Sequence, residues 1–121
     1  MVAITNVYGG RTPDEQFRIM FGKRLRRLRM MRGLTQADVE YELGYKGNGA
    51  LSQVETGTKG MPINKVHAVA KLLKVHPAVL LSQRDLSDKD LEIMVDTFDF
   101  VSSDAPPERR DALSQAIKSM L

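Results

Sequence analysis

Residues 34–57 contain two helix-like segments that are too short to be stable alone. The first, LTQADVEYELG, has Thr35 as an N-cap with an acid three residues later, and Gly44 ends it after about two turns. The second, GNGALSQVETG, has two glycines at its start, no positive charge and a glycine at its end. Because isolated helices of this length are marginal in water, both segments need tertiary packing from the chain around them.

Amphipathic helices are predicted on both sides of these segments. Thr12 and Glu15 form a capping-box pattern, which predicts a helix from Pro13 to about Arg32. Its apolar stripe consists of Phe17, Met20, Phe21, Leu25 and Leu28, surrounded by Lys23, Arg24, Arg26, Arg27, Arg29 and Arg32. Further helices are expected from Pro62 to Lys74 and from His76 to Leu81. Five helices with short links predict an all-α domain at residues 12–83, preceded by a flexible arm at residues 1–11.

Residues 84–121 predict a helical appendage of two helices. Ser87 and Asp90 form another capping-box pattern, and a final helix is expected from Pro107 onward. The inward-facing apolar residues are expected to be Leu91, Met94, Val95 and Phe98 on the first helix, and Leu113 and Ile117 on the second. Two amphipathic helices cannot bury their own stripes, so they must pack on the first domain or on another copy of the chain.

Charge is distributed unevenly along the chain. Of the 18 Lys and Arg residues, 13 lie in residues 1–83, whereas of the 15 Asp and Glu residues only 6 do. A basic front part suits a polyanion such as nucleic acid, and an acidic rear part suits a protein partner. The chain has no cysteine, no apolar run that could span a membrane and no signal-peptide pattern at its start, so we expect a cytoplasmic protein.

The two short segments, together with the pattern from Pro62 to Leu81, resemble the helix-turn-helix family of phage repressors and Cro proteins (XRE-like). The resemblance covers about residues 16–82 and depends on Thr35-Gln36, Gly44, Leu51-Ser52, Glu55 and Gly57 in combination. It implies a five-helix, lambda-repressor-like domain. It also implies that GNGALSQVETG contains the recognition helix, which would enter the major groove of double-stranded DNA.

The resemblance also assigns roles to individual residues. The base-reading positions fall on Asn48, Gly49 and Gln53, with Lys46 and Ser52 close enough to contribute. Gln36 matches a phosphate-contacting position, and the basic residues Arg26, Arg27 and Lys59 are expected to meet phosphates as well. Arg29 and Glu55 match a pair that forms an internal ion pair in several family members, so we expect them to be structural.

Two features depart from the family pattern. The turn between Gly44 and Leu51 is one residue longer than usual, and Glu40 stands where the family has a small residue, usually Ala. The small residue normally packs against the recognition helix. We therefore expect the longer turn to move the two helices apart and to let Glu40 point outward, which would change the docking angle on DNA.

The sequence thus predicts a DNA-binding transcriptional regulator, a repressor that binds a partly palindromic operator as a dimer or higher homo-oligomer. The apolar residues of 84–121 would form the oligomer interface. Two alternatives stay open: an antitoxin or phage regulator whose C-terminal helices bind a protein partner, and a protein-interaction module that has lost DNA binding.

We expect no enzymatic activity, cofactor or metal site. The glycines at residues 44–49 lack the Gly-Lys-Ser/Thr ending of a phosphate-binding loop. The acids of residues 85–99 follow helix spacing on a solvated face, with no histidine nearby. His67 and His76 have no third ligand candidate, and His76 is expected to cap the helix that begins at Pro77.

Overall fold

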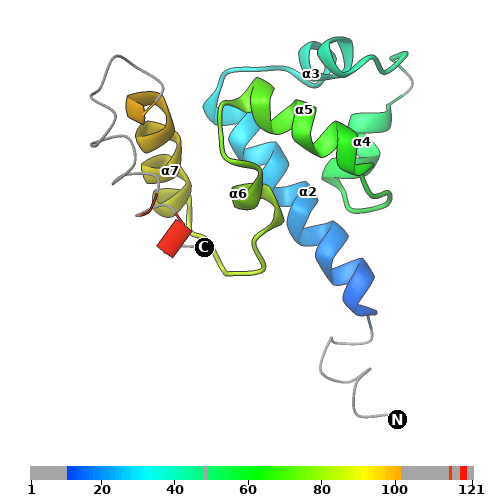
Figure 1. Ribbon diagram of the computed structural model, residues 1–121. Helices are drawn as coiled ribbons and strands as arrows, with labels where there is room; N and C mark the ends of the chain where they lie inside the picture. The colour runs from blue at the N-terminus through cyan, green and yellow to red at the C-terminus, as the bar shows by residue number, and fades with distance from the viewer. Residues whose placement is uncertain (1–10, 48, 102–114, 116–117, 120–121) are drawn as a thin grey trace. The chain divides into compact units, whose positions relative to one another are not determined.

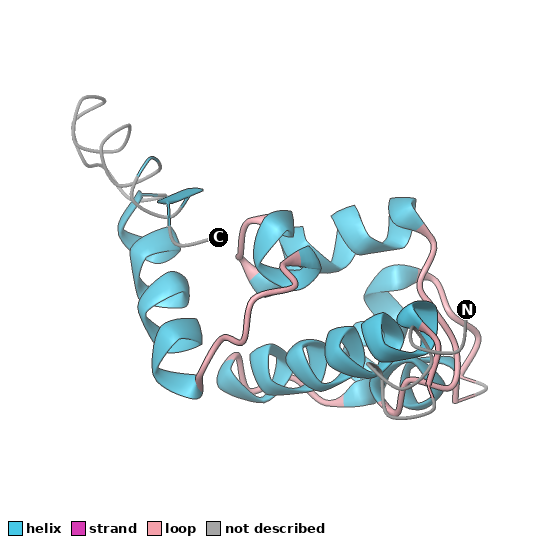
Figure 2. Ribbon diagram, turned by 90° about the horizontal axis from the view of Figure 1, so that it is seen from below, coloured by secondary structure: helices cyan, strands magenta, loops and turns pink. Residues whose placement is uncertain are grey.

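The computed structural model describes residues 11–47, 49–101, 115, 118 and 119. In this part of the chain the regular structure is entirely helical, and no strand is present (Figure 2). The prediction of an all-α protein is confirmed. The elements, labelled in Figure 1, are α2 (Pro13–Met31), α3 (Gln36–Leu43), α4 (Ala50–Glu55), α5 (Ile63–Leu73), α6 (Pro77–Leu81) and α7 (Asp88–Val101).

The chain divides into two compact units, residues 1–63 and 64–121. The first contains α2, α3 and α4, and within it α4 packs against both α2 and α3. The second contains nearly all of α5 together with α6 and α7. The predicted break at 102–107 lies outside the described residues. Of the predicted final helix only residues 115, 118 and 119 are described, and all three are helical.

The helix starts follow the capping patterns in the sequence. The Thr12 hydroxyl accepts a hydrogen bond from the Glu15 N–H at 3.1 Å, and the Glu15 carboxylate accepts one from the Thr12 N–H at 3.3 Å. Ser87 and Asp90 make the same reciprocal bonds at 3.0 and 3.1 Å, and α7 begins at the next residue. At α6, the His76 Nδ1 accepts from the Ala78 N–H at 3.1 Å. These three predictions are confirmed, because each cap satisfies backbone N–H groups that a helix start leaves unpaired.

The glycines before the second short helix form the turn that leads into it. Gly47 and Gly49 have φ angles of 67° and 77°, and Gly49 is the N-cap of α4. Other residues rarely adopt such left-handed backbone, whereas glycine does so without steric cost. The glycines therefore shape the connection between α3 and α4, and they are not part of α4 itself.

The apolar core on α2 follows part of the predicted stripe, and one charged residue joins it. Phe21, Leu25 and Leu28 are buried, whereas Phe17 and Met20 are half-buried. Arg24 stands among the basic residues expected around the stripe, yet it is only 5% exposed. It is four residues from both Met20 and Leu28, so helical spacing places its side chain on the face of the stripe.

Buried residues of the second unit come from all of its helices and from the α5–α6 connection. They are Val66, Val69, Ala70, Leu73, Val75, Val79, Leu80, Leu91, Met94 and Val95. Every one of them is apolar. By contrast, the buried charged residues of the described chain, Arg24, Glu40 and Glu55, belong to the first unit.

Candidate nucleic-acid interface

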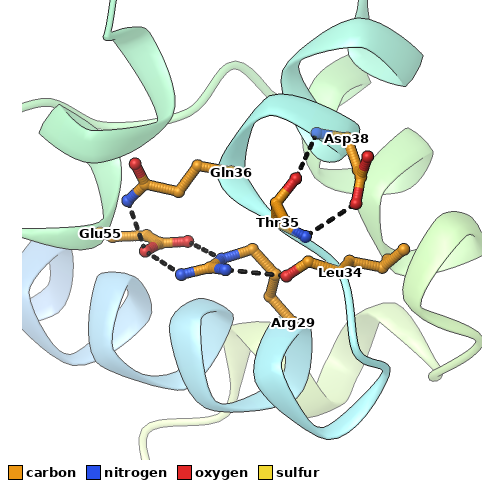
Figure 3. Close-up of polar contacts among 6 residues, drawn as sticks. All are labelled: Arg29, Leu34, Thr35, Gln36, Asp38 and Glu55. Carbon is orange, nitrogen blue, oxygen red and sulfur yellow. Dashed lines mark hydrogen bonds and ion pairs between the residues drawn. The ribbon is translucent and has the colours of Figure 1, made fainter.

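An ion pair between Arg29 and Glu55 connects α2 to the end of α4. The Arg29 Nε donates to Glu55 Oε2 at 2.7 Å, and the Arg29 Nη2 donates to Glu55 Oε1 at 3.1 Å (Figure 3). The two side chains are 11% and 3% exposed. A third N–H of the guanidinium, on Nη1, donates to the Leu34 carbonyl oxygen at 2.8 Å. This two-point geometry fixes both the distance and the orientation between α2 and α4.

Gln36 extends the same network to the first residue of α3. Its Nε2 donates to Glu55 Oε1 at 3.1 Å, as Figure 3 shows. A side-chain amide has two N–H donors, so one remains for another acceptor. The family resemblance predicts a phosphate contact for Gln36, and the structure shows that its side chain bonds to Glu55. We refer to Arg29, Gln36 and Glu55 together as the buried polar cluster.

The start of α3 beside this cluster is capped as predicted. The Thr35 N–H donates to Asp38 Oδ2 at 2.9 Å, and the Asp38 N–H donates to the Thr35 hydroxyl oxygen at 3.0 Å (Figure 3). The backbone bond from Thr35, and secondarily the bond with its side chain, lower the pKa of the Asp38 carboxyl. The α3 start is therefore held from two sides, by its own cap and by Glu55 from α4.

The predicted base-reading residues are found in and just before α4. Ser52 and Gln53 lie on α4 and are half-buried, whereas Lys46 and Gly49 are exposed in the turn that precedes it. Asn48 lies outside the described residues. The backbone carbonyl of Gln53 accepts from the N–H groups of Thr58 and Lys59 at 2.9 and 3.2 Å, which ties the following turn to α4.

The predicted phosphate-binding residues other than Gln36 are exposed. Lys59 lies in the turn after α4, and Arg26 and Arg27 lie on α2. With Lys23 and Met30, which are also exposed, these two arginines have the i, i+3, i+4, i+7 spacing of one helix face. We call this face the α2 basic stripe. It lies away from the face that carries Leu25 and Leu28 in the core.

Glu40 does not point outward, so that expectation was wrong. Its side chain is 8% exposed, and its Oε2 has no hydrogen-bond partner within the described structure. The Tyr45 N–H donates to the Glu40 carbonyl oxygen at 2.9 Å. Burial, and then the nearby Glu40 charge, raise the pKa of the Tyr45 hydroxyl. The backbone after α3 therefore bonds back to the helix at Tyr45, and Glu40 is not released to solvent.

One of three comparisons with known proteins identifies the family. A protein-family model described as a helix-turn-helix domain matches residues 20–83, which is more than half of the chain. The chain belongs to this helix-turn-helix domain family. Comparison with curated proteins and with solved structures gives no match. Helix-turn-helix domains bind DNA and are typically not enzymes, so the family supports a DNA-binding regulator.

Two glycines position α4 in this helix-turn-helix domain. Sequence reasoning missed Gly22 and used Gly57 only as part of the family pattern. A Cβ on Gly22 would lie 2.3 Å from the Val54 carbonyl oxygen and 2.6 Å from the Glu55 carbonyl oxygen. A Cβ on Gly57, whose φ is 82°, would lie 2.7 Å from Ile19 Cγ1. Any side chain at either position would separate α2 from the segment around α4. A lone glycine within the helical pattern of α2 was the available signal for Gly22.

The predicted oligomer interface requires a correction. Leu91, Met94 and Val95 are 1%, 2% and 8% exposed within the single chain, so they are not available as a surface for a second copy. The sequence analysis allowed two ways to cover the apolar face of this helix, by the rest of the chain or by another copy. The burial of these residues within the single chain corresponds to the first. Phe98 is half-buried, and Leu113 and Ile117 lie outside the described residues.

The described residues contain neither a metal-site cluster nor a membrane-spanning helix. Within residues 11–47 and 49–101, no three potential ligands among His, Asp and Glu side chains come together as a metal site. None of the described helices combines the length and the apolar character needed to cross a membrane.

Proposed function

We propose that the protein is a transcriptional repressor that recognises a specific sequence in double-stranded DNA through α4. The family match to residues 20–83 is the observation that carries this proposal. The buried polar cluster supports it, because Glu55 at the end of α4 holds both Arg29 of α2 and Gln36 of α3. The positions of α3 and α4 are thus fixed before DNA is bound, so binding to DNA requires little further ordering of α4.

Base reading in this proposal comes from the N-terminal part of α4 and the preceding turn. Gln53 and Ser52 on the helix, with Asn48, Gly49 and Lys46 before it, carry hydrogen-bonding groups suited to base edges. An Asn or Gln amide matches the N6 and N7 pattern of adenine in the major groove. The exposed glycine at position 49 leaves room for close approach of the backbone.

Anchoring in this proposal comes from charge and from Gln36. The second N–H of the Gln36 amide is directed to a phosphate while the first remains on Glu55. Arg26, Arg27 and Lys59 add sequence-independent attraction to the DNA backbone. This division separates residues that select the sequence from residues that set the affinity.

The operator in this proposal is partly palindromic and is bound by a dimer, with recognition helices in successive major grooves about 34 Å apart. Because Leu91 and Met94 are buried in the single chain, the contact between copies must use other residues. Ile93 and Phe100 on α7 are exposed, at 43% and 39%. Light scattering at micromolar concentration tests the dimer, and a monomeric mass both alone and on operator DNA would contradict it.

The decisive experiment for DNA reading is selection of duplexes from a randomised pool at about 150 mM salt, followed by sequencing. We expect an inverted repeat with half-sites about ten base pairs apart. With the selected site, Gln53→Ala should cost about 1–3 kcal/mol and relax one base position, whereas Arg26→Ala should weaken all sequences alike. No enrichment would favour a protein-interaction module that has lost DNA binding.

Salt dependence separates these possibilities further. A complex that neutralises six or more phosphates should weaken by about a thousandfold between 50 and 200 mM salt. Binding of a protein partner through exposed apolar residues such as Ile93 and Phe100 should change little over the same range. The selected duplex placed before a reporter gene tests repression directly, since occupancy should lower expression and Gln53→Ala should restore it.

A further inference from the structure

The second unit contains a surface hollow whose lining includes none of the residues assigned above to DNA reading or anchoring. It is lined by His67, Ala68 and Lys71 of α5, by Val75 and His76 of the α5–α6 connection, by Pro77 of α6 and by Phe98 of α7. Its volume is ≈ 470 Å³. Hollows of about 300–1,000 Å³ are the usual size for small-molecule sites in proteins. Three separate segments of one compact unit therefore converge on a space that suits a small organic molecule.

The wall of the hollow is predominantly apolar. Val75 is buried, and Pro77 and Phe98 are half-buried, so each presents part of its apolar surface to the space. Phe98 comes from α7, whereas His67, Ala68 and Lys71 come from α5. An aromatic or aliphatic body placed in the hollow would remove apolar surface from water on several sides, which is the main favourable contribution to binding of such a group.

The polar side chains of the lining are His67, Lys71 and His76. Each can donate a hydrogen bond, and Lys71 also carries a positive charge. His67 and Lys71 are exposed and one helical turn apart on α5, so their side chains lie on the same face. The His76 Nδ1 accepts from the Ala78 N–H, which leaves the proton of a neutral ring on Nε2. No Asp or Glu belongs to the lining. A ligand with one anionic group therefore fits better than a cation.

We propose that this hollow binds a small organic carboxylate, with its carboxylate near Lys71 and the histidines and its apolar body against Val75, Pro77 and Phe98. A carboxylate suits the lining better than a phosphate group because Lys71 is the only permanent cation there. The apolar wall in turn requires a hydrocarbon part that inorganic anions lack. The site is independent of the DNA-binding proposal, since none of its residues belongs to the helix-turn-helix segment from Thr35 to Gly57.

The test is titration of the full-length protein with phenylacetate, followed by ¹H–¹⁵N and ¹H–¹³C NMR, with phenylacetamide as the neutral counterpart. We expect saturable shifts confined to the lining residues, with dissociation constants in the range of about 0.1–10 mM for a ligand of this size. The amide should bind about tenfold more weakly, because it lacks the charge that Lys71 attracts.

Three variants sharpen the test without disturbing the core. Lys71→Gln removes the charge, and Ala68→Leu fills the hollow from an exposed helix position. Each should raise the dissociation constant of phenylacetate by about tenfold or more. Lys89→Gln removes an exposed lysine of α7 outside the lining and should leave binding unchanged.

Three outcomes would overturn the proposal. The first is the absence of saturable shifts with phenylacetate and with octanoate, a second probe with a purely aliphatic body. The second is equal affinity for the amide and the acid. The third is equal loss in Lys71→Gln and Lys89→Gln, which would show a general effect of net charge.

Discussion

The two units of this protein bury different kinds of side chains. In residues 1–63 the buried set includes Arg24, Glu40 and Glu55, and α4 is positioned by an ion pair and by backbone that approaches Gly22. In the described part of residues 64–121, every buried residue is apolar. Apolar packing tolerates small shifts, whereas two-point hydrogen bonds and glycine contacts do not. The unit that carries α4 is therefore the one built with fixed geometry.

The largest effect is expected at the ion pair that holds α4. Arg29→Met should lower the free energy of unfolding by about 3–5 kcal/mol, because it leaves the Glu55 carboxylate, 3% exposed, without its guanidinium. The double variant Arg29→Met/Glu55→Leu should recover most of that loss, since no charge is then left buried. Urea denaturation measures both. Lys23→Met, on the exposed face of the same helix, is the control and should change stability by less than about 0.5 kcal/mol.

In the second unit, a comparable loss of stability should follow from removing a buried apolar side chain. Leu91 is 1% exposed, so Leu91→Ala should cost about 3 kcal/mol through lost apolar contact and a residual cavity. Ile93, two residues along α7, is 43% exposed, and Ile93→Ala should cost well under about 1 kcal/mol. Thermal and urea unfolding of the two variants measure the difference. Equal losses would mean that the two faces of α7 are equally buried in solution.

The close approach of α2 and α4 predicts a slightly smaller effect. Gly22→Ala places a methyl group where the carbonyl oxygens of Val54 and Glu55 now lie, so it should cost about 2–3 kcal/mol and weaken DNA binding. Gly60→Ala is the matched control, because its Cβ would meet only the Arg18 side chain at 3.6 Å. Urea unfolding and DNA titration report both effects. Unchanged stability in Gly22→Ala would refute the close contact.

Replacing Glu40 is expected to raise stability, whereas the three substitutions above lower it. Glu40→Met keeps the side-chain volume and removes a buried carboxylate oxygen that has no partner, so stability should rise by about 1–2 kcal/mol. Glu42→Met, on an exposed position of the same helix, should have almost no effect. Both are read by urea denaturation. If Glu40→Met destabilised the protein, the carboxylate would have to be compensated in solution.

The smallest effect concerns pH and the cap of α3. Hydrogen bonds from Thr35 lower the pKa of the Asp38 carboxyl in the folded protein, from an ordinary value of 3.8. The cap therefore adds stability above about pH 4 and loses it as the pH falls through the lowered folded-state pKa. The stability difference between wild type and Asp38→Ala should shrink over that range. In a Thr35→Ala background this pH dependence should weaken but persist, because the bond from the residue-35 backbone N–H, which is the larger cause of the lowered pKa, is retained. A pH series of urea titrations can show this.

Local signals in the sequence account for most of the helix boundaries. Capping boxes at Thr12 and Thr35 and the cap at His76 each involve residues within three positions, so their bonds can be read without knowledge of the fold. The partnership of Arg29 with Glu55 was accessible only through the family resemblance, because 26 positions separate them. Gly22 was missed because a glycine inside a helix does not reveal which backbone lies against it.

Glu40 and α7 show where sequence reasoning failed. A glutamate was expected to point toward water, yet Glu40 is buried. Local sequence preferences do not predict such burial, because it depends on how the surrounding elements pack. The stripe of Leu91, Met94 and Val95 indicated only that α7 must be covered. Periodicity identifies an apolar face but not the surface that covers it.

The sequence by itself determined the helical class, most of the helix ends and the helix-turn-helix pattern, because these depend on short-range hydrogen bonds and on the 3.6-residue period. Only the tertiary structure decided which charges are buried, how closely α4 approaches α2 and which apolar face is already covered. These properties depend on contacts between residues distant in the chain, and each is set by the space that the other elements leave.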